Sequence, residues 1–138
     1  MPQVYNRTRT FTVQPADRTA NETIILMAVK KGFRILAVAM ERKVLGSTAN
    51  TISLRASTAA GGASAGLQGA LDTSTSTAGS IVGGAGADLA TSGGFLCTAD
   101  GTLDAVYTAV GGGGSTVPVV RVSVTWTIDP VVAGQALG

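Results

Sequence analysis

Few side chains in this sequence could take part in catalysis. The 138 residues include no histidine and one cysteine, Cys97. A Ser-His-Asp or Cys-His relay needs an imidazole to move the proton, and a closed zinc site needs several His or Cys ligands. Cys97 falls in a short apolar run, which favours a small buried hydrophobe over a nucleophile. The sequence therefore predicts a protein that is not an enzyme.

Three further patterns resemble ligand sites without meeting their requirements. Asp100 and Asp104 flank a glycine turn, but a calcium loop needs oxygen ligands at closer spacing and usually a glutamate. The glycine-rich residues 83–88 lack the lysine and the strand-to-helix context of a phosphate loop. Lys30 and Lys31 could bind an anion, but a lysine pair at a turn is usually solvated. We expect no metal site and no cofactor.

The composition points to a protein that forms surfaces. It has 19 Gly, 21 Ala, 18 Thr and 10 Ser, and only 13% of its residues are charged. A hydrophobic content of 45% argues against disorder throughout the chain. A lightly charged surface of small residues suits a protein that is largely covered by partners. The length predicts a single domain spanning residues 1–138.

Charge is unevenly placed along the chain. Residues 1–55 hold nine bases and three acids, a net of +6, whereas residues 56–138 hold one base and five acids, a net of −4. Either the two halves lie against each other or neighbouring copies dock head to tail. Aromatic content of 4% and the absence of long basic clusters argue against nucleic-acid binding. We interpret one basic set as partner-binding, although charges that guard strand edges would give the same pattern. Its members are Arg7, Arg9, Lys30, Lys31, Arg34, Arg42 and Lys43.

Hydrophobic alternation predicts a β protein. Val120, Val122, Val124, Trp126 and Ile128 alternate with polar residues, as in a half-buried antiparallel strand. Trp126, the single tryptophan, is the expected core anchor. Further strands are predicted at the six stretches 9–14, 23–29, 33–40, 51–55, 95–98 and 103–110. About seven antiparallel strands without a long amphipathic helix indicate a sandwich or a barrel.

The connections are predicted from turn residues. Residues 51–55 are expected to pair with residues 35–40 as a hairpin, and Asp100-Gly101 to form the turn of another hairpin. The stretch at 33–40 has apolar residues on both faces, which is typical of a central strand; a helix over 34–45 is the alternative.

Residues 56–94 differ from the rest, because 31 of these 39 positions are Ala, Gly, Ser or Thr. We expect a long surface loop with one or two short elements that contacts a neighbouring molecule, and the spacing of Leu67 and Leu71 is compatible with a single helical turn. Residues 1–8 are predicted to form an N-terminal arm, and residues 129–138 a C-terminal tail.

No targeting or membrane segment is expected. The N-terminus lacks the apolar stretch of a signal peptide, and the longest early apolar run is residues 24–29. Six residues are far fewer than the roughly 18 needed to cross a bilayer. One cysteine cannot form an intrachain disulfide, which fits synthesis in a reducing cytoplasm.

Two stretches resemble the small head proteins of tailed bacteriophages. One is residues 31–38, Lys-Gly-Phe-Arg-Ile-Leu-Ala-Val, followed by residues 51–54; the other is residues 95–103, Phe-Leu-Cys-Thr-Ala-Asp-Gly-Thr-Leu, with a glycine tip before the last strand. The resemblance spans residues 9–128 in layout and implies a jelly-roll-like capsid decoration, or cement, protein. Such proteins are commonly homotrimers made in the host bacterial cytoplasm, and they bind the major capsid protein on the virion exterior. The implied function is head stabilisation, and a tail or fibre module that binds host glycans is the alternative.

Overall fold

The computed structural model describes residues 6–17, 19–46, 48–58, 64–74, 81–83, 94–110 and 116–128. Within these ranges the chain forms β-strands and no helix, which confirms the all-β prediction. The strands are β1 (Arg7–Val13), β2 (Glu22–Val29), β3 (Phe33–Val44), β4 (Thr51–Thr58), β5 (Ser64–Asp72), β6 (Ile81–Gly83), β7 (Phe95–Leu96), β8 (Gly101–Thr108) and β9 (Val119–Ile128).

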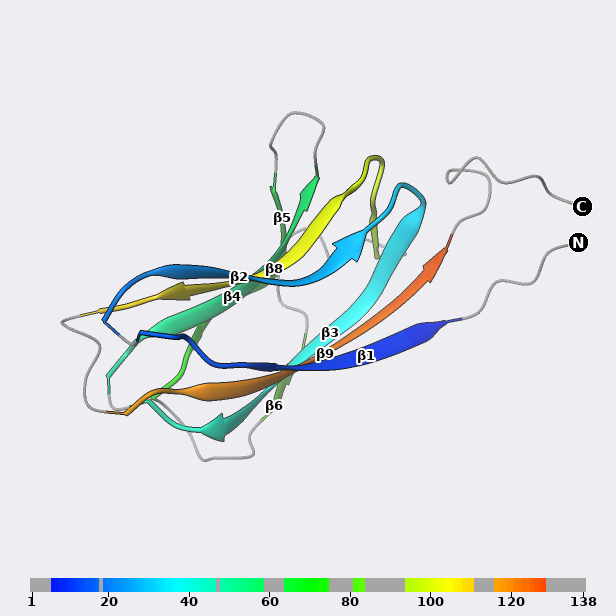
Figure 1. The fold of residues 1–138 in the computed structure, drawn as a ribbon. Helices are drawn as coiled ribbons and strands as arrows, with labels where there is room; N and C mark the ends of the chain where they lie inside the picture. Colours follow the sequence, from blue (N-terminus) through cyan, green and yellow to red (C-terminus); the bar gives the residue numbers. More distant parts are fainter. Residues whose placement is uncertain are drawn as a thin grey trace, which may run out of the picture.

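The strands form two antiparallel sheets (Figure 1). Sheet A has the order β1-β9-β3-β6. The two-residue β7 pairs with the start of β3, on the same edge that pairs with β6 further along. Sheet B has the order β2-β8-β4-β5. In Figure 1 β2 and β8 lie in the upper layer, and β1 and β9 lie in the lower one.

This strand order is that of a jelly roll. Apart from the short β7, strands from the two ends of the chain pair in a nested series: β1 with β9, β2 with β8, β3 with β6, and β4 with β5. The pairs β3–β9 and β4–β8 then join these ribbons into two four-stranded sheets. Eight strands wound in this way are characteristic of the double-sheet jelly roll.

The core forms between the inner faces of the two sheets. On β9 the side chains of Val120, Val122 and Val124 are fully buried, and Trp126 is 6% exposed. The Trp126 ring stacks on Phe33, with ring centroids 6.0 Å apart. The alternation along β9 therefore produces the buried face that the sequence predicts.

The strand β3 is central in sheet A, but its outer face is not covered throughout, because Ala37 is exposed. A register shift between Ile35 and Ala37 changes the phase of the alternation, so that Ile35 and Val38 are both buried. The bulge therefore explains why the sequence appears apolar on both faces.

Two predicted hairpins are wrong. β4 (Thr51–Thr58) pairs with β5 and β8 in sheet B, and not with β3, so the chain crosses between the sheets after β3. β7 and β8 also lie in different sheets, and Asp100 instead accepts a hydrogen bond from the backbone N–H of Lys31 at 2.9 Å. The turn residues predicted where the chain changes direction, but they did not predict with which strand the following strand pairs.

The elements expected within residues 56–94 are strands, namely the nine-residue β5 and the short β6. Leu67 and Leu71 lie on β5 and are buried, and they do not form a helical turn. In the expected arm at residues 1–8, β1 already begins at Arg7. Residues 1–5, most of the remaining loop and the tail at 129–138 lie outside the described residues.

Candidate partner-binding surface

Five of the seven cationic residues predicted to bind a partner come together at one end of the sandwich. Arg7 and Arg9 lie at the start of β1, Lys30 and Lys31 in the turn between β2 and β3, and Arg34 at the start of β3. These segments meet because the last residues of β9 pair with the first residues of both β1 and β3.

The other two candidates, Arg42 and Lys43, lie at the far end of β3. At about 3.3 Å per residue, eight residues separate Arg34 from Arg42 by about 26 Å. Arg42 is also buried, and its Nε donates a hydrogen bond to the backbone oxygen of Asp72 at 3.0 Å. The seven residues therefore do not form one rim, and the arginine at position 42 has a structural role in tying β3 to the end of β5.

The side chains of Arg7 and Arg9 lie on the core-facing side of β1. Arg9 is directly opposite Val124, and Arg7 is opposite Trp126, and opposed residues of an antiparallel pair project from the same face. Along this face Arg7 and Arg9 are exposed, Phe11 is half-buried, and Val13 is fully buried. Sheet B thus covers one end of β1 and leaves the arginine end open.

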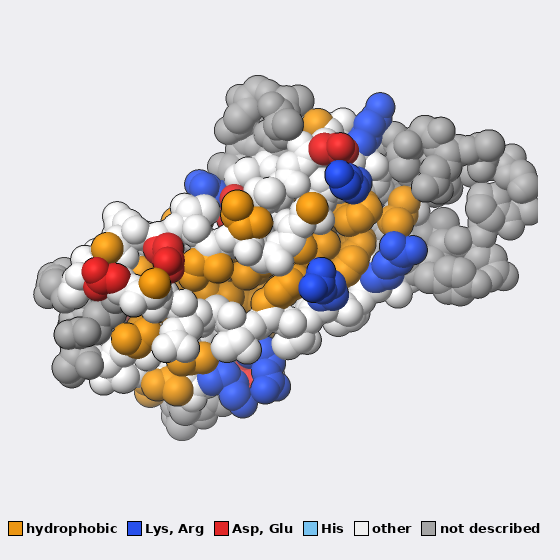
Figure 2. Space-filling model, viewed as in Figure 1, with side chains coloured by type: hydrophobic (Ala, Val, Ile, Leu, Met, Phe, Trp, Pro, Cys, Tyr) orange, Lys and Arg blue, Asp and Glu red, His pale blue; other side chains and the backbone are white. Residues whose placement is uncertain are grey.

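Half-buried apolar side chains continue this open region between the two sheet edges. Phe11 on β1, and Ile24 and Leu26 on β2, all pack against the core while remaining partly exposed. We call these three residues the apolar seam. Figure 2 shows a stripe of hydrophobic side chains between the layers, with Lys and Arg side chains on both sides of it toward one end.

The arginines beside the apolar seam have no acidic partner within the described ranges. The guanidinium of Arg9 lies over the Phe11 ring, 5.0 Å from its centroid, and ion pairs in these ranges involve neither Arg7 nor Arg9. Lys30 pairs with Asp100 at 3.8 Å, and both side chains are more than half exposed. The positive charge at this end is therefore only partly offset.

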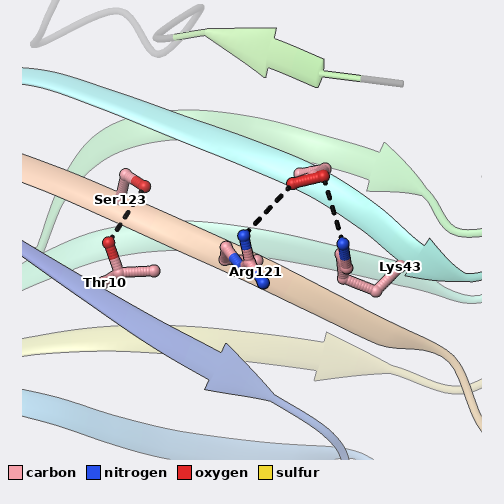
Figure 3. Close-up of polar contacts among 5 residues, drawn as sticks. Thr10, Lys43, Arg121 and Ser123 are labelled. Atoms are coloured by element: carbon pink, nitrogen blue, oxygen red, sulfur yellow. Dashed lines mark hydrogen bonds and ion pairs between the residues drawn. The ribbon is translucent and has the colours of Figure 1, made fainter. Parts of the chain in front are cut away.

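Apart from Lys43, the polar residues on the outer face of sheet A are absent from the set predicted to bind a partner. Thr8 and Thr10 on β1 share hydrogen bonds with Thr125 and Ser123 on β9, at 3.1 and 3.4 Å between hydroxyl oxygens (the second is drawn in Figure 3). The signal was the polar half of the alternation in both strands, which places small hydroxyl side chains on a common face.

An ion-pair cluster follows on this outer face. The Glu41 carboxylate lies 3.8 Å from Arg121 Nη1 and 3.5 Å from Lys43 Nζ. Dashed lines in Figure 3 mark the ion pairs made by Arg121 and Lys43. Both cationic side chains are more than 40% exposed, so each pair contributes about 0–1 kcal/mol.

The two oppositely charged halves of the sequence lie against each other. Arg55 from the basic half lies 3.5 Å from the buried Asp104 of the acidic half, and Ser57 donates a hydrogen bond to the same carboxylate oxygen at 3.0 Å. On the neighbouring edge strand, Ile25 is opposite Asp104 and is 66% exposed. A base of the first half thus pairs with an acid of the second half within the fold, as the first of the two sequence-based explanations predicts.

The geometry offers little reactive chemistry. Burial raises the pKa of the Cys97 thiol to about 11, which keeps it protonated and poorly nucleophilic near neutral pH. Among the described residues no three Cys, Asp or Glu side chains converge as metal ligands. The same residues include no helix of the length and apolarity needed to span a membrane.

Comparisons with solved structures found chains of similar fold in virus structures. A chain in the capsid asymmetric unit of cyanophage Pam1 is similar over 91% of this chain and 84% of its own length, with 18% identity and a TM-score of 0.54. A chain in the acid-stable capsid of Helicobacter pylori bacteriophage KHP30 matches over 91% and 94%, with 10% identity and a TM-score of 0.51. A chain of infectious bursal disease virus, Gx strain, matches 93% of this chain but 32% of its own length, with 13% identity and a TM-score of 0.55.

These similarities confirm the expected jelly-roll-like fold. Neither a protein-family model nor a curated protein sequence matches the chain.

Proposed function

We propose that this chain is a structural virion protein that binds the outer surface of a major capsid protein and stabilises a phage head. The observation that carries the proposal is the match of nearly the whole jelly roll to a chain of comparable length within a cyanophage capsid asymmetric unit. The chain is thus similar in fold and size to a protein that occurs in an assembled shell.

The physical mechanism is adhesive. Each bound copy adds buried area across the joints between capsid subunits, so that pressure from packaged DNA must break those contacts as well. A specific interface of this kind needs about 1,000 Å² or more of buried surface. A homotrimer would multiply weak contacts through a high effective concentration. Only 13% of the residues are charged, a composition that supports extensive coverage of the surface by partners.

The surface also supports a role without catalysis. The cysteine is buried and protonated near neutral pH, and the described acids are engaged with turns, strands or cations. The alternative, a glycan-binding tail module, needs exposed aromatic rings. Tyr107 is fully buried and Trp126 is nearly so, which counts against that alternative.

The test is binding to undecorated capsids, assembled from the major capsid protein encoded with this chain. We expect the chain to co-sediment with them at a fixed stoichiometry and to raise the temperature at which they rupture. Bovine serum albumin at the same concentration controls for trapping in the pellet. If the chain stays in the supernatant across micromolar concentrations, or binds without protecting the shell from heat, the proposal is wrong.

A further inference from the structure

We infer that the edge strand β1, with the apolar seam beside it, receives an extended acidic segment of a capsid partner by strand addition. This inference rests on the proposed capsid role and names the kind of segment that would be bound. The surface consists of β1 (Arg7–Val13) together with Phe11, Ile24 and Leu26 of the apolar seam.

Among the described residues, β1 is a regular edge with no further strand beside it. Its pairing with β9 runs through seven successive residues without a register shift, and it is the terminal strand of sheet A. A straight edge strand presents unpaired backbone groups that can bind a further strand. The edge of sheet B is less suitable, because β2 is interrupted by a register shift between Ile25 and Met27.

The charge of β1 favours an acidic partner. Arg7 and Arg9 project from the core-facing side of β1 and remain exposed, without an acidic partner in the described part of the chain. Charged residues on the inward face of an edge strand disfavour pairing between identical edges. Oppositely charged residues placed directly opposite them on an added strand stabilise the pair, and like charges destabilise it. The edge therefore selects an acidic strand.

The order of side chains along β1 defines the sequence pattern of the partner segment. The core-facing positions of β1 are Arg7, Arg9, Phe11 and Val13; both arginines are exposed, Phe11 is half-buried and Val13 is buried. An antiparallel segment would place two carboxylates opposite the arginines and an apolar side chain opposite Phe11, where Ile24 and Leu26 are also partly exposed. Small polar residues would continue the hydroxyl face formed by Thr8 and Thr10.

The test uses a synthetic peptide with the sequence Thr-Val-Thr-Glu-Thr-Glu-Thr, acetylated and amidated. In the antiparallel register its valine lies opposite Phe11 and its glutamates lie opposite Arg9 and Arg7. The control peptide has lysine in place of both glutamates. Binding to the full chain is followed by amide chemical shifts during a titration at low salt.

We expect the glutamate peptide to bind at least about tenfold more tightly than the lysine peptide, since two cross-strand charge pairs change sign. The shifted amides should be those of residues 6–13 and of the β2 positions in the apolar seam. Arg9→Glu should reduce affinity for the glutamate peptide several-fold, whereas Lys43→Glu, the same charge change at the far end of β3, should not. The inference is overturned if the two peptides bind equally or if neither binds. It is also overturned if the two variants have equal effects.

Capsid co-sedimentation separates this inference from the proposed function. We expect Arg9→Glu to weaken capsid binding and Lys43→Glu to leave it unchanged. If both variants bind capsids like the parent chain, the capsid role stands and the inference fails. If the parent chain ignores capsids, the proposed function fails and the peptide titration alone decides the inference. If the chain self-associates, Arg9→Glu abolishes this association and the glutamate peptide does not bind, the edge binds a second copy and the inference is wrong.

Discussion

Replacing Asn50 tests whether one buried polar residue holds together an end of the sandwich. Asn50 is fully buried in the link between β3 and β4. Its Nδ2 donates a hydrogen bond to Tyr107 Oη at 2.6 Å, and its Oδ1 accepts one from the backbone N–H of Val110 at 2.8 Å. Its backbone oxygen accepts hydrogen bonds from the N–H and the hydroxyl of Thr73, both at 2.9 Å.

Asn50→Ala removes the side-chain hydrogen bonds to Tyr107 and Val110 and leaves those of the Asn50 backbone oxygen. Two net hydrogen bonds are worth about 2 kcal/mol, and a buried group that loses its partner costs about 1–3 kcal/mol more. We expect the free energy of unfolding to fall by about 3–5 kcal/mol. Urea unfolding followed by the fluorescence of the single tryptophan measures this change by linear extrapolation.

The chain contains a matched control in Asn21. Its Oδ1 accepts a hydrogen bond from the backbone N–H of Ala109 at 2.9 Å, next to the bond that Asn50 accepts, but Asn21 is exposed. Asn21→Ala should cost less than about 1 kcal/mol, because water replaces the lost partner. In a double-mutant cycle with Tyr107→Phe, Asn50→Ala should show a coupling energy of about 0.5–3 kcal/mol. Equal costs for the two asparagines would refute the argument from burial.

Three further expectations concern single side chains. Trp126→Ala should lower the free energy of unfolding by about 3–5 kcal/mol. Trp126→Phe should lower it much less, because the buried indole N–H has no acceptor among the described residues. Urea unfolding followed by circular dichroism distinguishes the two variants. Since burial raises the pKa of Cys97 to about 11, the unfolded thiol loses its proton first as the pH rises, so stability should be independent of this thiol below pH 9 and fall as the pH rises from 9 toward 11. Cys97→Ala should remove that part of the pH dependence, and an unchanged profile would contradict the assignment. Arg42→Ala should cost about 2 kcal/mol because it breaks a hydrogen bond to the end of β5, whereas Lys43→Ala should cost less than about 0.5 kcal/mol; equal melting temperatures would show that burial does not separate them.

Much of the fold could be predicted from the alternation of large side chains. The strand at residues 120–128 was the clearest, because its valines and Trp126 all project to the core. The strand at 33–40 was also predicted correctly, although the bulge after Ile35 disguised which face is buried. Pairing could not be predicted, because local turn chemistry is the same whether the chain folds back within a sheet or crosses to the other.

The strand β5 was missed for a simple geometric reason. Leu67 and Leu71 are four residues apart, a spacing that puts them on one face of a helix and equally on one face of a strand. Around them the segment is mostly alanine, glycine and serine, which have no strong preference for strand. Their burial against the core becomes evident only once β4 lies beside them.

The basic candidate set was separated by the same long-range contacts. Arg7 and Lys31 meet at one end only because β9 links the starts of β1 and β3, a pairing far apart in sequence. Arg42 and Lys43 are adjacent in the chain, yet strand alternation buries the first and exposes the second. No composition signal distinguishes these two neighbours.

We propose that this jelly roll binds the outside of a viral shell. Electron cryomicroscopy of capsids imaged with and without the added chain tests it most directly. We predict additional density on the outer surface, at symmetry-related joints between capsid subunits, into which the two sheets fit. Identical maps, or density for the chain only on the inner surface, would contradict the account.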